Sequence, residues 1–598
     1  MSAFDRLSVT AIADAVQSGT RTAADVARAT LERVDAYETV QPQVWITRVD
    51  PAAVFVAARA VDDEIAAGRQ LPLAGVPFAV KDNMDVSGLP TTAGCPAFAY
   101  RPRDTAPVLQ RLLDAGAILI GKTNLDQFAT GLVGTRSPYG ACASVYNREY
   151  ISGGSSSGSA VAVAAGLVAF ALGTDTAGSG RVPAAFNHLV GLKPTKGRWS
   201  ARGVVPACRS QDCVSVFTST AVDAARIDDV VAHFDAADPY ARHAPERLRT
   251  RAPSTFRVGV PSQRHLEWFS DRQSEQLFRD AVARVGAMGG KLVEIDIAPL
   301  REAAKLLYEG PWVAERTVAT EALLASQPSA IHPVVRGILE HGLRFSAAEA
   351  FKAEYRLRDF QRAAERLWET IDVLLLPTTP TTYRLRDVLA EPLGLNSNLG
   401  TYTNFVNLLD MSAIAVPAGF RDNATAFGVT LLGPAWSDRL LLDLANRYED
   451  IAPMPETRPL DLAGTEQGVK LAVVGAHLAS MPLHWQLTSR DARLVKRCRT
   501  APAYKLYAMA NTTPAKPALV HVGEAGAAIE VEVYDLTVEA FGSFTAEVPP
   551  PLAIGTVTLD DGTDVKGFVA EPRALEGAED ITALGGWRAY VAREKART

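Results

Sequence analysis

Two stretches rich in serine and glycine place hydroxyl groups on predicted turns, where a serine can act as a nucleophile. The first is GGSSSGSA at 153–160, and the second is GTDTAGSGRVPAA at 173–185. The first stretch is too short, and too closely flanked by patterned segments, to be a linker. It lacks the lysine of a Walker phosphate loop, and no GxGxxG fingerprint accompanies it. Catalysis by serine is therefore the chemistry that these residue types would support.

The second stretch carries Ser179 on a glycine-rich turn. A predicted strand ends before it at Asp175, and a predicted helix with Pro183 near its first turn follows. Such a turn offers backbone N–H groups that can stabilise an oxyanion beside a nucleophile. Turns of this composition are also common in proteins without catalytic function. The pattern leaves two interpretations of Ser179 open, a nucleophile and a structural turn residue.

The general base that would activate Ser179 is not an evident histidine. His188 falls on a predicted helix, and no GxSxG elbow is present. Lys81 ends the apolar strand PFAVK, where a charged side chain is unexpected unless it has a partner or a function. Burial would lower the pKa of a lysine well below about 10.4, because desolvation disfavours the charged amine. The alternative is a strand-end lysine that extends to water.

Four motifs follow one another in a fixed order: GVPFAVKDN, GGSSSGSA, GTDTAGSGRVPAA and GLKPTKGR. The segment 1–454 that contains them resembles the amidase signature family, whose catalytic set is Ser-cisSer-Lys. The resemblance implies that Ser179 is the nucleophile, Ser155 the bridging serine and Lys81 the base, with a cis peptide bond before Ser155. It also implies an oxyanion hole made of the backbone N–H groups of Thr176, Ala177, Gly178 and Ser179.

Within that family, the stretches ARGVVPACRSQDCVSVF and YEGPWVAER resemble the allophanate hydrolases. Allophanate is a small anionic amide, so its pocket needs a cation and hydrogen-bond donors. The resemblance implies that Arg316 and Tyr308 bind its carboxylate, since a guanidinium can hold a carboxylate bidentately, and that Gly131 lies beside the site. Arg316 follows Tyr308 by eight positions (316 − 308), close to two helical turns, so one helix face could present both. An exposed helix arginine is the alternative for Arg316.

The implied reaction is hydrolysis of allophanate to ammonia and N-carboxycarbamate, which decarboxylates, in urea or triazine nitrogen catabolism. Two other functions remain open: a hydrolase of biuret or a small malonamate-like amide, and a subunit of a tRNA-dependent amidotransferase. No cofactor or metal is expected, and the histidines form no HExxH motif. The implied partners are a urea carboxylase or biuret hydrolase that supplies the substrate, and a second copy of the chain in a homodimer.

Two stretches after residue 467, VKLAVVGAHLASMPLHWQL and GAAIEVEVYDL, resemble the C-terminal domain of allophanate hydrolases. That domain is related in fold to γ-glutamylcyclotransferases and is linked in its family to decarboxylation of N-carboxycarbamate. His477 follows an apolar strand, and an imidazole with a near-neutral pKa suits proton transfer to the decarboxylating fragment. His484 has apolar and aromatic neighbours that indicate packing. A purely structural or oligomerising domain is the alternative interpretation.

The elements that must position these residues alternate between short apolar strands and helices. Strands at GVPFAVKD, ILIGKTN and VAFALGTDT, with helices at APVLQRLLDAGA and SAVAVAAGL, predict an α/β fold in which a mixed β-sheet is flanked by helices on both faces. Three prolines without apolar periodicity in IAPMPETRPLDLAGTEQ predict an interdomain linker. We therefore expect an amidase signature domain at 1–455, a linker at 456–467 and a small α+β domain at 468–598.

The composition is that of a globular protein with a large core, with 47% hydrophobic and 21% charged residues among 598. The net charge of −6 offers no basic field for nucleic acid, and no apolar run reaches the ~20 residues of a membrane helix. The N-terminal stretch MSAFDRLSVTAIADAVQSG lacks the apolar core of a signal peptide, and the five cysteines form no CxxC pair. These features predict a cytoplasmic enzyme with reduced thiols.

Overall fold

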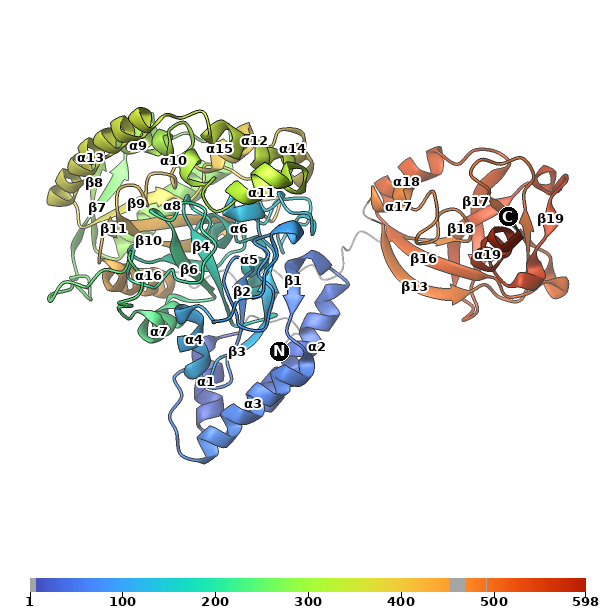
Figure 1. Ribbon diagram of the computed structural model, residues 1–598, viewed down its shortest axis with the longest axis horizontal. Coiled ribbons are helices and arrows are strands. Elements are labelled where there is room, and N and C mark those ends of the chain that lie inside the picture. Colours follow the sequence, from blue (N-terminus) through green and yellow to red (C-terminus); the bar gives the residue numbers. More distant parts are fainter. Residues whose placement is uncertain (1–6, 452–467, 491, 598) are drawn as a thin grey trace. The chain divides into compact units, whose positions relative to one another are not determined.

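The computed structural model describes residues 7–451, 468–490 and 492–597. The chain divides into two compact units, Met1–Leu460 and Asp461–Thr598 (Figure 1). The predicted linker at 456–467 lies outside the described residues. The predicted fold class is confirmed, because the first unit is a mixed sheet flanked by helices and the second is a smaller domain of sheets and short helices. None of the described helices is long and apolar enough to cross a membrane.

An eleven-stranded sheet forms the centre of the first unit. Its strands are β1 (Trp45–Arg48), β2 (Pro77–Lys81), β3 (Ile118–Thr123), β4 (Phe170–Asp175), β5 (Val190–Lys193), β6 (Cys213–Thr218), β7 (Phe256–Pro261), β8 (Gly290–Ile295), β9 (Val373–Pro377), β10 (Met411–Phe420) and β11 (Ala426–Pro434). Their order across the sheet is β1-β3-β2-β4-β6-β5-β10-β11-β9-β7-β8. Strand β2 pairs in parallel with β3 and β4, and β7 pairs in parallel with β8 and β9. The other pairs are antiparallel.

Helices pack around this sheet. The helices of the unit are α1 (Val9–Gln17), α2 (Ala23–Glu38), α3 (Pro51–Ala66), α4 (Pro107–Asp114), α5 (Ser157–Ala164), α6 (Val182–Phe186), α7 (Ala221–Val231), α8 (Arg272–Ala287), α9 (Ala298–Tyr308), α10 (Trp312–Glu315), α11 (Glu321–Ser326), α12 (Pro333–Gly342), α13 (Ala347–Thr370), α14 (Leu385–Ala390), α15 (Gly394–Leu399) and α16 (Asp438–Ile451). Helices α5 and α6 contact each other and the central strands, and α7, α8 and α16 form a second group that also contacts the sheet. In Figure 1 strands β4 and β6 run between α5 and α6 on one side and α7 and α16 on the other.

The parallel strands β2, β3 and β4 bring the predicted catalytic residues to one edge of the sheet. Lys81 is the last residue of β2 and lies opposite Thr123, the last residue of β3. Asp175 ends β4, and the turn with Ser179 follows it directly. Because the carboxyl ends of parallel strands point the same way, a lysine and a turn that are far apart in the sequence meet at this edge.

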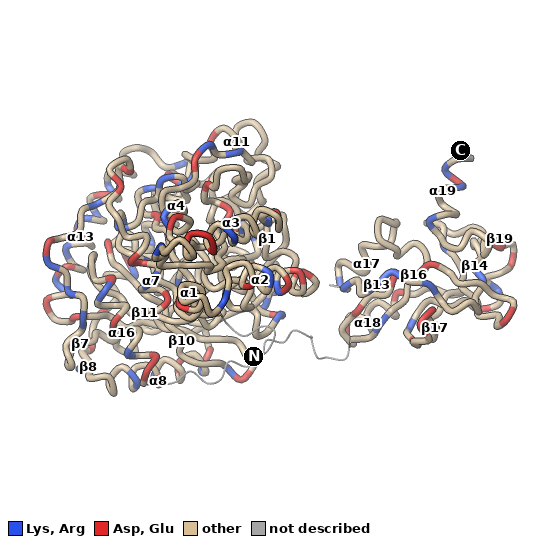
Figure 2. The backbone as a smooth tube through the Cα atoms, turned by 90° about the horizontal axis from the view of Figure 1, so that it is seen from below, with Lys and Arg blue, Asp and Glu red and all other residues tan. Residues whose placement is uncertain are grey.

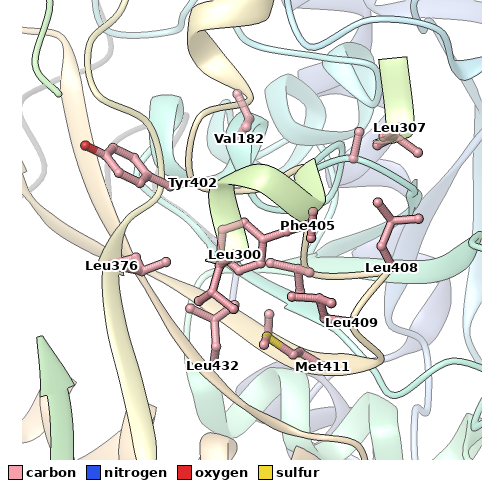
Figure 3. Close-up of a cluster of buried hydrophobic side chains, with 14 of the residues drawn as sticks. Val182, Leu300, Leu307, Leu376, Tyr402, Phe405, Leu408, Leu409, Met411 and Leu432 are labelled. Atoms are coloured by element: carbon pink, nitrogen blue, oxygen red, sulfur yellow. The ribbon is translucent and has the colours of Figure 1, made fainter. Parts of the chain in front are cut away.

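A buried apolar cluster supports the short helix that follows the Ser179 turn. Val182 in the first turn of α6 belongs to the same cluster as Leu300 and Leu307 of α9, and Phe405 and Met411 also lie in it (Figure 3). Burial of one such side chain contributes roughly 1.5–3 kcal/mol. The start of α6, and with it the turn that carries Ser179, is therefore held within this cluster and by packing on β10 and β11.

The second unit is built from two small sheets and short helices. Its strands are β12 (Val469–Val473), β13 (Arg493–Arg499), β14 (Tyr504–Ala508), β15 (Pro517–His521), β16 (Glu530–Leu536), β17 (Leu552–Thr558), β18 (Asp564–Ala570) and β19 (Glu579–Asp580), and its helices are α17 (Trp485–Thr488), α18 (Val538–Ala546) and α19 (Trp587–Arg597). The larger sheet has the order β13-β16-β12-β18-β17 and the smaller one β15-β14-β19. Acidic and basic residues are interspersed along both units (Figure 2), which agrees with the modest net charge of −6.

Candidate active site

Lys81 is completely buried and contacts two hydroxyl groups. Its Nζ donates hydrogen bonds of 2.7 Å to Ser155 Oγ and of 2.7 Å to Thr174 Oγ1. Burial lowers the pKa of Lys81 to about 7, although the carboxylate of Asp126 acts in the opposite direction. An amine with this pKa is largely neutral slightly above neutral pH. A neutral Lys81 can accept a proton from Ser155 over the same short distance.

Ser155 lies just before α5, and the peptide bond that joins it to Gly154 is cis, as the resemblance implied. The Ser155 carbonyl accepts a hydrogen bond of 3.0 Å from the Asp126 backbone N–H. Gly154 must be glycine, because a Cβ there would collide with the Asp126 carboxylate and with the Gly134 backbone nitrogen. Asp126 thus fixes the backbone on which Ser155 is presented to Lys81.

Ser179 lies on the turn between β4 and α6, with only 2% of its surface exposed. Its Oγ donates a hydrogen bond of 3.4 Å to the Gly131 carbonyl. Within the described parts of the chain, Ser155 Oγ bonds to Lys81 and not to Ser179. A relay from Ser179 to Ser155 therefore requires the Ser179 hydroxyl to turn away from Gly131.

The turn that carries Ser179 is anchored by the carboxylate of Asp175. Asp175 accepts hydrogen bonds from the Gly178 and Gly180 backbone N–H groups, at 3.0 and 3.1 Å, and two more of 2.9 Å from Arg181. Although burial opposes it, the Arg181 guanidinium keeps the pKa of Asp175 below its ordinary value. Asp175 and Arg181 therefore hold the loop in place.

The backbone N–H groups of this turn differ in their availability. That of Gly178, one of the predicted oxyanion-hole donors, is engaged by Asp175 and is the least suited to that role. Among the described residues, the N–H groups of Thr176, Ala177 and Ser179 donate to no other group of the protein. These three remain available to a developing negative charge. The geometry thus favours a smaller set of donors than the four that we expected.

Arg316 and Tyr308 are close together, but not in the way that their spacing predicts. Tyr308 ends α9, and Gly310 and Pro311 separate it from α10, so the two residues are not on one helix face. Helix α9 ends there because proline cannot continue the hydrogen-bonding pattern of a helix. The Arg316 guanidinium nevertheless lies 4.9 Å from the centre of the Tyr308 ring and donates a hydrogen bond of 3.3 Å to its hydroxyl. The alternative of an exposed arginine is wrong, because Arg316 is only 2% exposed.

Arg316 is connected to the predicted nucleophile through two neighbouring residues. Its Nη1 donates a hydrogen bond of 3.2 Å to Thr130 Oγ1, and Gly131, the next residue, accepts the hydrogen bond from Ser179. Gly131 must lack a side chain, since a Cβ there would collide with the Asp126 carboxylate. The structure therefore brings Gly131, Tyr308 and Arg316 to the same side of Ser179.

Three contacting residues were not predicted. Thr174 and Thr130 receive hydrogen bonds from Lys81 and Arg316, and Asp126 accepts hydrogen bonds from the Gly134 and Arg136 backbone N–H groups. Thr174 lies within the motif GTDTAGSGRVPAA, and Asp126 and Thr130 lie within NLDQFATG. Their positions inside or beside the motifs were a usable signal, but the motifs alone do not say which side chains point inward.

His477 lies in the second unit, at the wall of a cavity of about 240 Å³. Its Nε2 is 2.7 Å from Gln486 Oε1, and its ring stacks on Phe568 with the centroids 5.0 Å apart. Lys516 also lines the cavity. Burial lowers the pKa of His477 below its usual value.

Two family models match the chain. The amidase family matches residues 27–442, and the allophanate hydrolase C-terminal domain matches residues 469–592. The two matches correspond to the two compact units.

Individual relatives agree with these matches. The urea amidolyase of Lachancea kluyveri is 46% identical over 572 residues, which are 92% of this chain but 31% of the relative, so this chain spans about a third of that protein. The structure of selenomethionine-substituted Kluyveromyces lactis allophanate hydrolase is 42% identical, with a TM-score of 0.67 and coverage of 95% of this chain and 99% of that one. A glutamyl-tRNA(Gln) amidotransferase subunit of Chloroflexus aggregans is 33% identical over 499 residues, or 77% of this chain and 100% of the relative.

Proposed function

Because this chain belongs to the amidase family, we propose that it hydrolyses an amide, and that this amide is allophanate. The products of this step are ammonia and N-carboxycarbamate. The allophanate hydrolase C-terminal domain and the likeness to the Kluyveromyces lactis allophanate hydrolase support this choice within the family.

The reaction begins when Ser179 Oγ attacks the terminal amide carbon of allophanate. Its proton passes to Ser155 Oγ as the Ser155 proton passes to the neutral amine of Lys81. The carbonyl oxygen becomes negative and is stabilised by the N–H groups of Thr176, Ala177 and Ser179. When the carbon–nitrogen bond breaks, the proton returns through Ser155 to the departing ammonia. Water then attacks the acyl-enzyme and the same relay takes its proton. The proton returns through Ser155 to Ser179 Oγ as the bond between Ser179 and the acyl carbon breaks.

The observation that carries the choice of an anionic substrate is the position of Arg316. Arg316 is a buried cation, and no carboxylate of the described residues bonds to its guanidinium. It is linked to Ser179 through Thr130 and Gly131. Within the described part of the chain its Nε has no hydrogen-bond partner. Because Arg316 combines an unused N–H group with this link to the nucleophile, we expect it to bind a ligand with negative charge. Allophanate supplies a carboxylate next to the amide that Ser179 attacks, whereas biuret is neutral.

The test compares ammonia release from allophanate and biuret by the wild type and by Arg316→Gln. Loss of the charge should reduce kcat/KM for allophanate by about tenfold to 100-fold, the effect of removing a charged hydrogen bond, and should affect biuret much less. Arg136→Gln is the matched control, because Arg136 is also buried but its guanidinium bonds, within the described residues, to the backbone carbonyls of Thr130 and Pro392, so its loss should affect both amides alike. Equal losses for both amides in Arg316→Gln would contradict the proposed specificity.

We further propose that His477 assists decarboxylation of N-carboxycarbamate in the second unit. Its support is the position of the imidazole at the wall of a cavity that also contains Lys516. In the same proposal the enzyme is a cytoplasmic homodimer that needs no cofactor, and a urea carboxylase or biuret hydrolase supplies allophanate. The name of the Lachancea relative, urea amidolyase, supports the urea route.

A further inference from the structure

A loop formed by residues 207–212 contacts the turn that carries Ser179. Asp212 Oδ1 accepts a short hydrogen bond from Thr176 Oγ1 and a bond of 3.1 Å from the Cys208 backbone N–H. Its Oδ2 accepts a hydrogen bond of 2.9 Å from the Ala207 backbone N–H. The carboxylate therefore ties both ends of the 207–212 loop together and holds the side chain of Thr176.

The opposite side of the same loop is fastened to α10. The Ser210 backbone N–H and Oγ donate hydrogen bonds of 2.7 Å each to the two carboxylate oxygens of Glu315. The thiol of Cys208 contacts the Trp312 carbonyl at 3.4 Å. Glu315 is the last residue of α10, and Arg316 comes directly after it. The 207–212 loop therefore lies between the arginine proposed to bind the substrate carboxylate and the first N–H group of the proposed oxyanion hole.

We propose that Asp212 is a positioning residue that orients the oxyanion hole through the Thr176 hydroxyl, and that the 207–212 loop sets the distance between this hole and Arg316. The proposal rests on the proposed function, in which the Thr176 N–H stabilises the oxyanion.

The hydrogen bonds of the turn explain why it needs this support. Asp175 anchors the later part of the turn, at Gly178, Gly180 and Arg181. The N–H groups of Thr176 and Ala177 donate to no protein acceptor in the described residues, as donors to a transient oxyanion must. The peptide that carries the Thr176 N–H is held from its other side, where the Asp175 carbonyl accepts a hydrogen bond of 2.8 Å from Asn407 Nδ2. The Thr176 side chain supplies a second anchor, and a carboxylate acceptor makes that bond stronger than a neutral one.

An oxyanion-hole donor that is slightly misdirected weakens binding of the transition state more than binding of the substrate. Loss of the Asp212 contact should therefore lower kcat and leave KM nearly unchanged. A residue that only stabilised the fold would instead lower the fraction of folded protein, and one that bound substrate directly would raise KM.

The experiment measures kcat and KM for Thr176→Val, Thr176→Ser, Asp212→Asn and the double variant Thr176→Val/Asp212→Asn in the full-length chain. Thr176→Val removes the hydroxyl with little change in shape. Asp212→Asn replaces one carboxylate oxygen by an NH2 group. At least one of the three donors that now bind to Asp212, the Thr176 hydroxyl and the Ala207 and Cys208 N–H groups, then faces another donor. We expect each to lower kcat about tenfold to 100-fold, with KM changed by less than about threefold, because the donor is displaced rather than deleted. Thr176→Ser keeps the hydroxyl and should keep most of the activity.

The double variant decides whether Asp212 acts through Thr176. If it does, the double variant is no slower than the slower single variant, because both remove the same contact. Multiplied losses in the double variant, or wild-type kcat in Thr176→Val, would overturn the proposal. If thermal unfolding shows that Asp212→Asn is unfolded, the comparison of Thr176→Val with Thr176→Ser is the test. An equal loss of kcat in these two variants would overturn the proposal.

The wild type is assayed first on allophanate and on biuret. This distinguishes failure of the proposed function from failure of the role proposed for Asp212. If the wild type cleaves biuret but not allophanate, the proposed substrate is wrong and the variants are compared on biuret, since an oxyanion hole serves any amide. If it cleaves neither, both proposals fall. If it is active and the variants behave like the wild type, only the role of Asp212 falls.

Discussion

At the scale of single residues, the proposed chemistry depends on a lysine whose amine bonds to no counter-ion among the described residues. Lys81 Nζ bonds to two neutral hydroxyl groups, Ser155 and Thr174, and to no carboxylate in the described chain. Lys122, also buried, bonds to the Asp82 carboxylate at 3.1 Å and has a structural place in the sheet. The contrast explains how one buried lysine can act as a base while a second one stabilises a strand.

The pH dependence follows from the pKa of Lys81. Burial lowers it to about 7, and only the neutral amine can accept a proton, so kcat/KM should rise with pH around 7 and level off above it. Asp212 has its own pKa raised by burial to about 6 and must be ionised to hold Thr176, so its titration also lowers activity on the acidic side.

A pH series of kcat/KM for the wild type and for Asp212→Asn tests this assignment. The Asp212 carboxylate raises the pKa of Lys81, so the variant should have its midpoint at a lower pH than the wild type. A rate that falls as the pH rises through 7, or a variant midpoint displaced to higher pH, would contradict the role of Lys81 as the base.

The residues themselves show how much of the site was predictable. Lys81, Ser155 and Ser179 lie in motifs of unusual composition, and the structure brings Lys81 and Ser155 within 2.7 Å. Thr130 was not predicted, because nothing in the sequence shows that its hydroxyl meets an arginine 186 positions away. Such contacts depend on how loops fold over the sheet edge, and side-chain types alone do not determine this.

At the scale of elements, the strands that end at the candidate site were predictable, and the helices α9 and α10 beside Tyr308 and Arg316 were not. The apolar runs that end at Lys81 and Asp175 are strands of the sheet, as predicted. The spacing of Tyr308 and Arg316 predicted one helix, but Gly310 and Pro311 end α9 and separate it from α10. The sequence YEGPWVAER contains a proline, and a proline inside a helix breaks it. The prediction from residue spacing did not take this proline into account.

At the scale of the whole molecule, the two compact units suggest a division of the chemistry. The relay lies within the first unit and His477 within the second. A protein of residues 1–460 should therefore fold and release the first ammonia from allophanate at a rate close to that of the full chain. If His477 assists decarboxylation, this truncation and His477→Ala should each make carbon dioxide lag behind ammonia.

Timed measurement of both products, by stopped-flow or mass spectrometry, checks this division. His484→Ala is the matched control, since His484 contacts the His477 carbonyl and the ring of Tyr534, and its loss should leave the timing unchanged. Identical timing in the full chain, the truncation and His477→Ala would leave the second unit a structural domain.

The central claim is that Ser179 cleaves allophanate, and its most direct test is ammonia released from allophanate by the full-length wild type and Ser179→Ala. We expect turnover by the wild type and a loss of about a thousandfold or more in the variant, because no other group in the relay can form the acyl-enzyme. Ser157→Ala, which alters a buried serine of α5 outside the relay, should remain active and controls for changes in packing. Near-normal ammonia release by a folded Ser179→Ala protein would contradict the account.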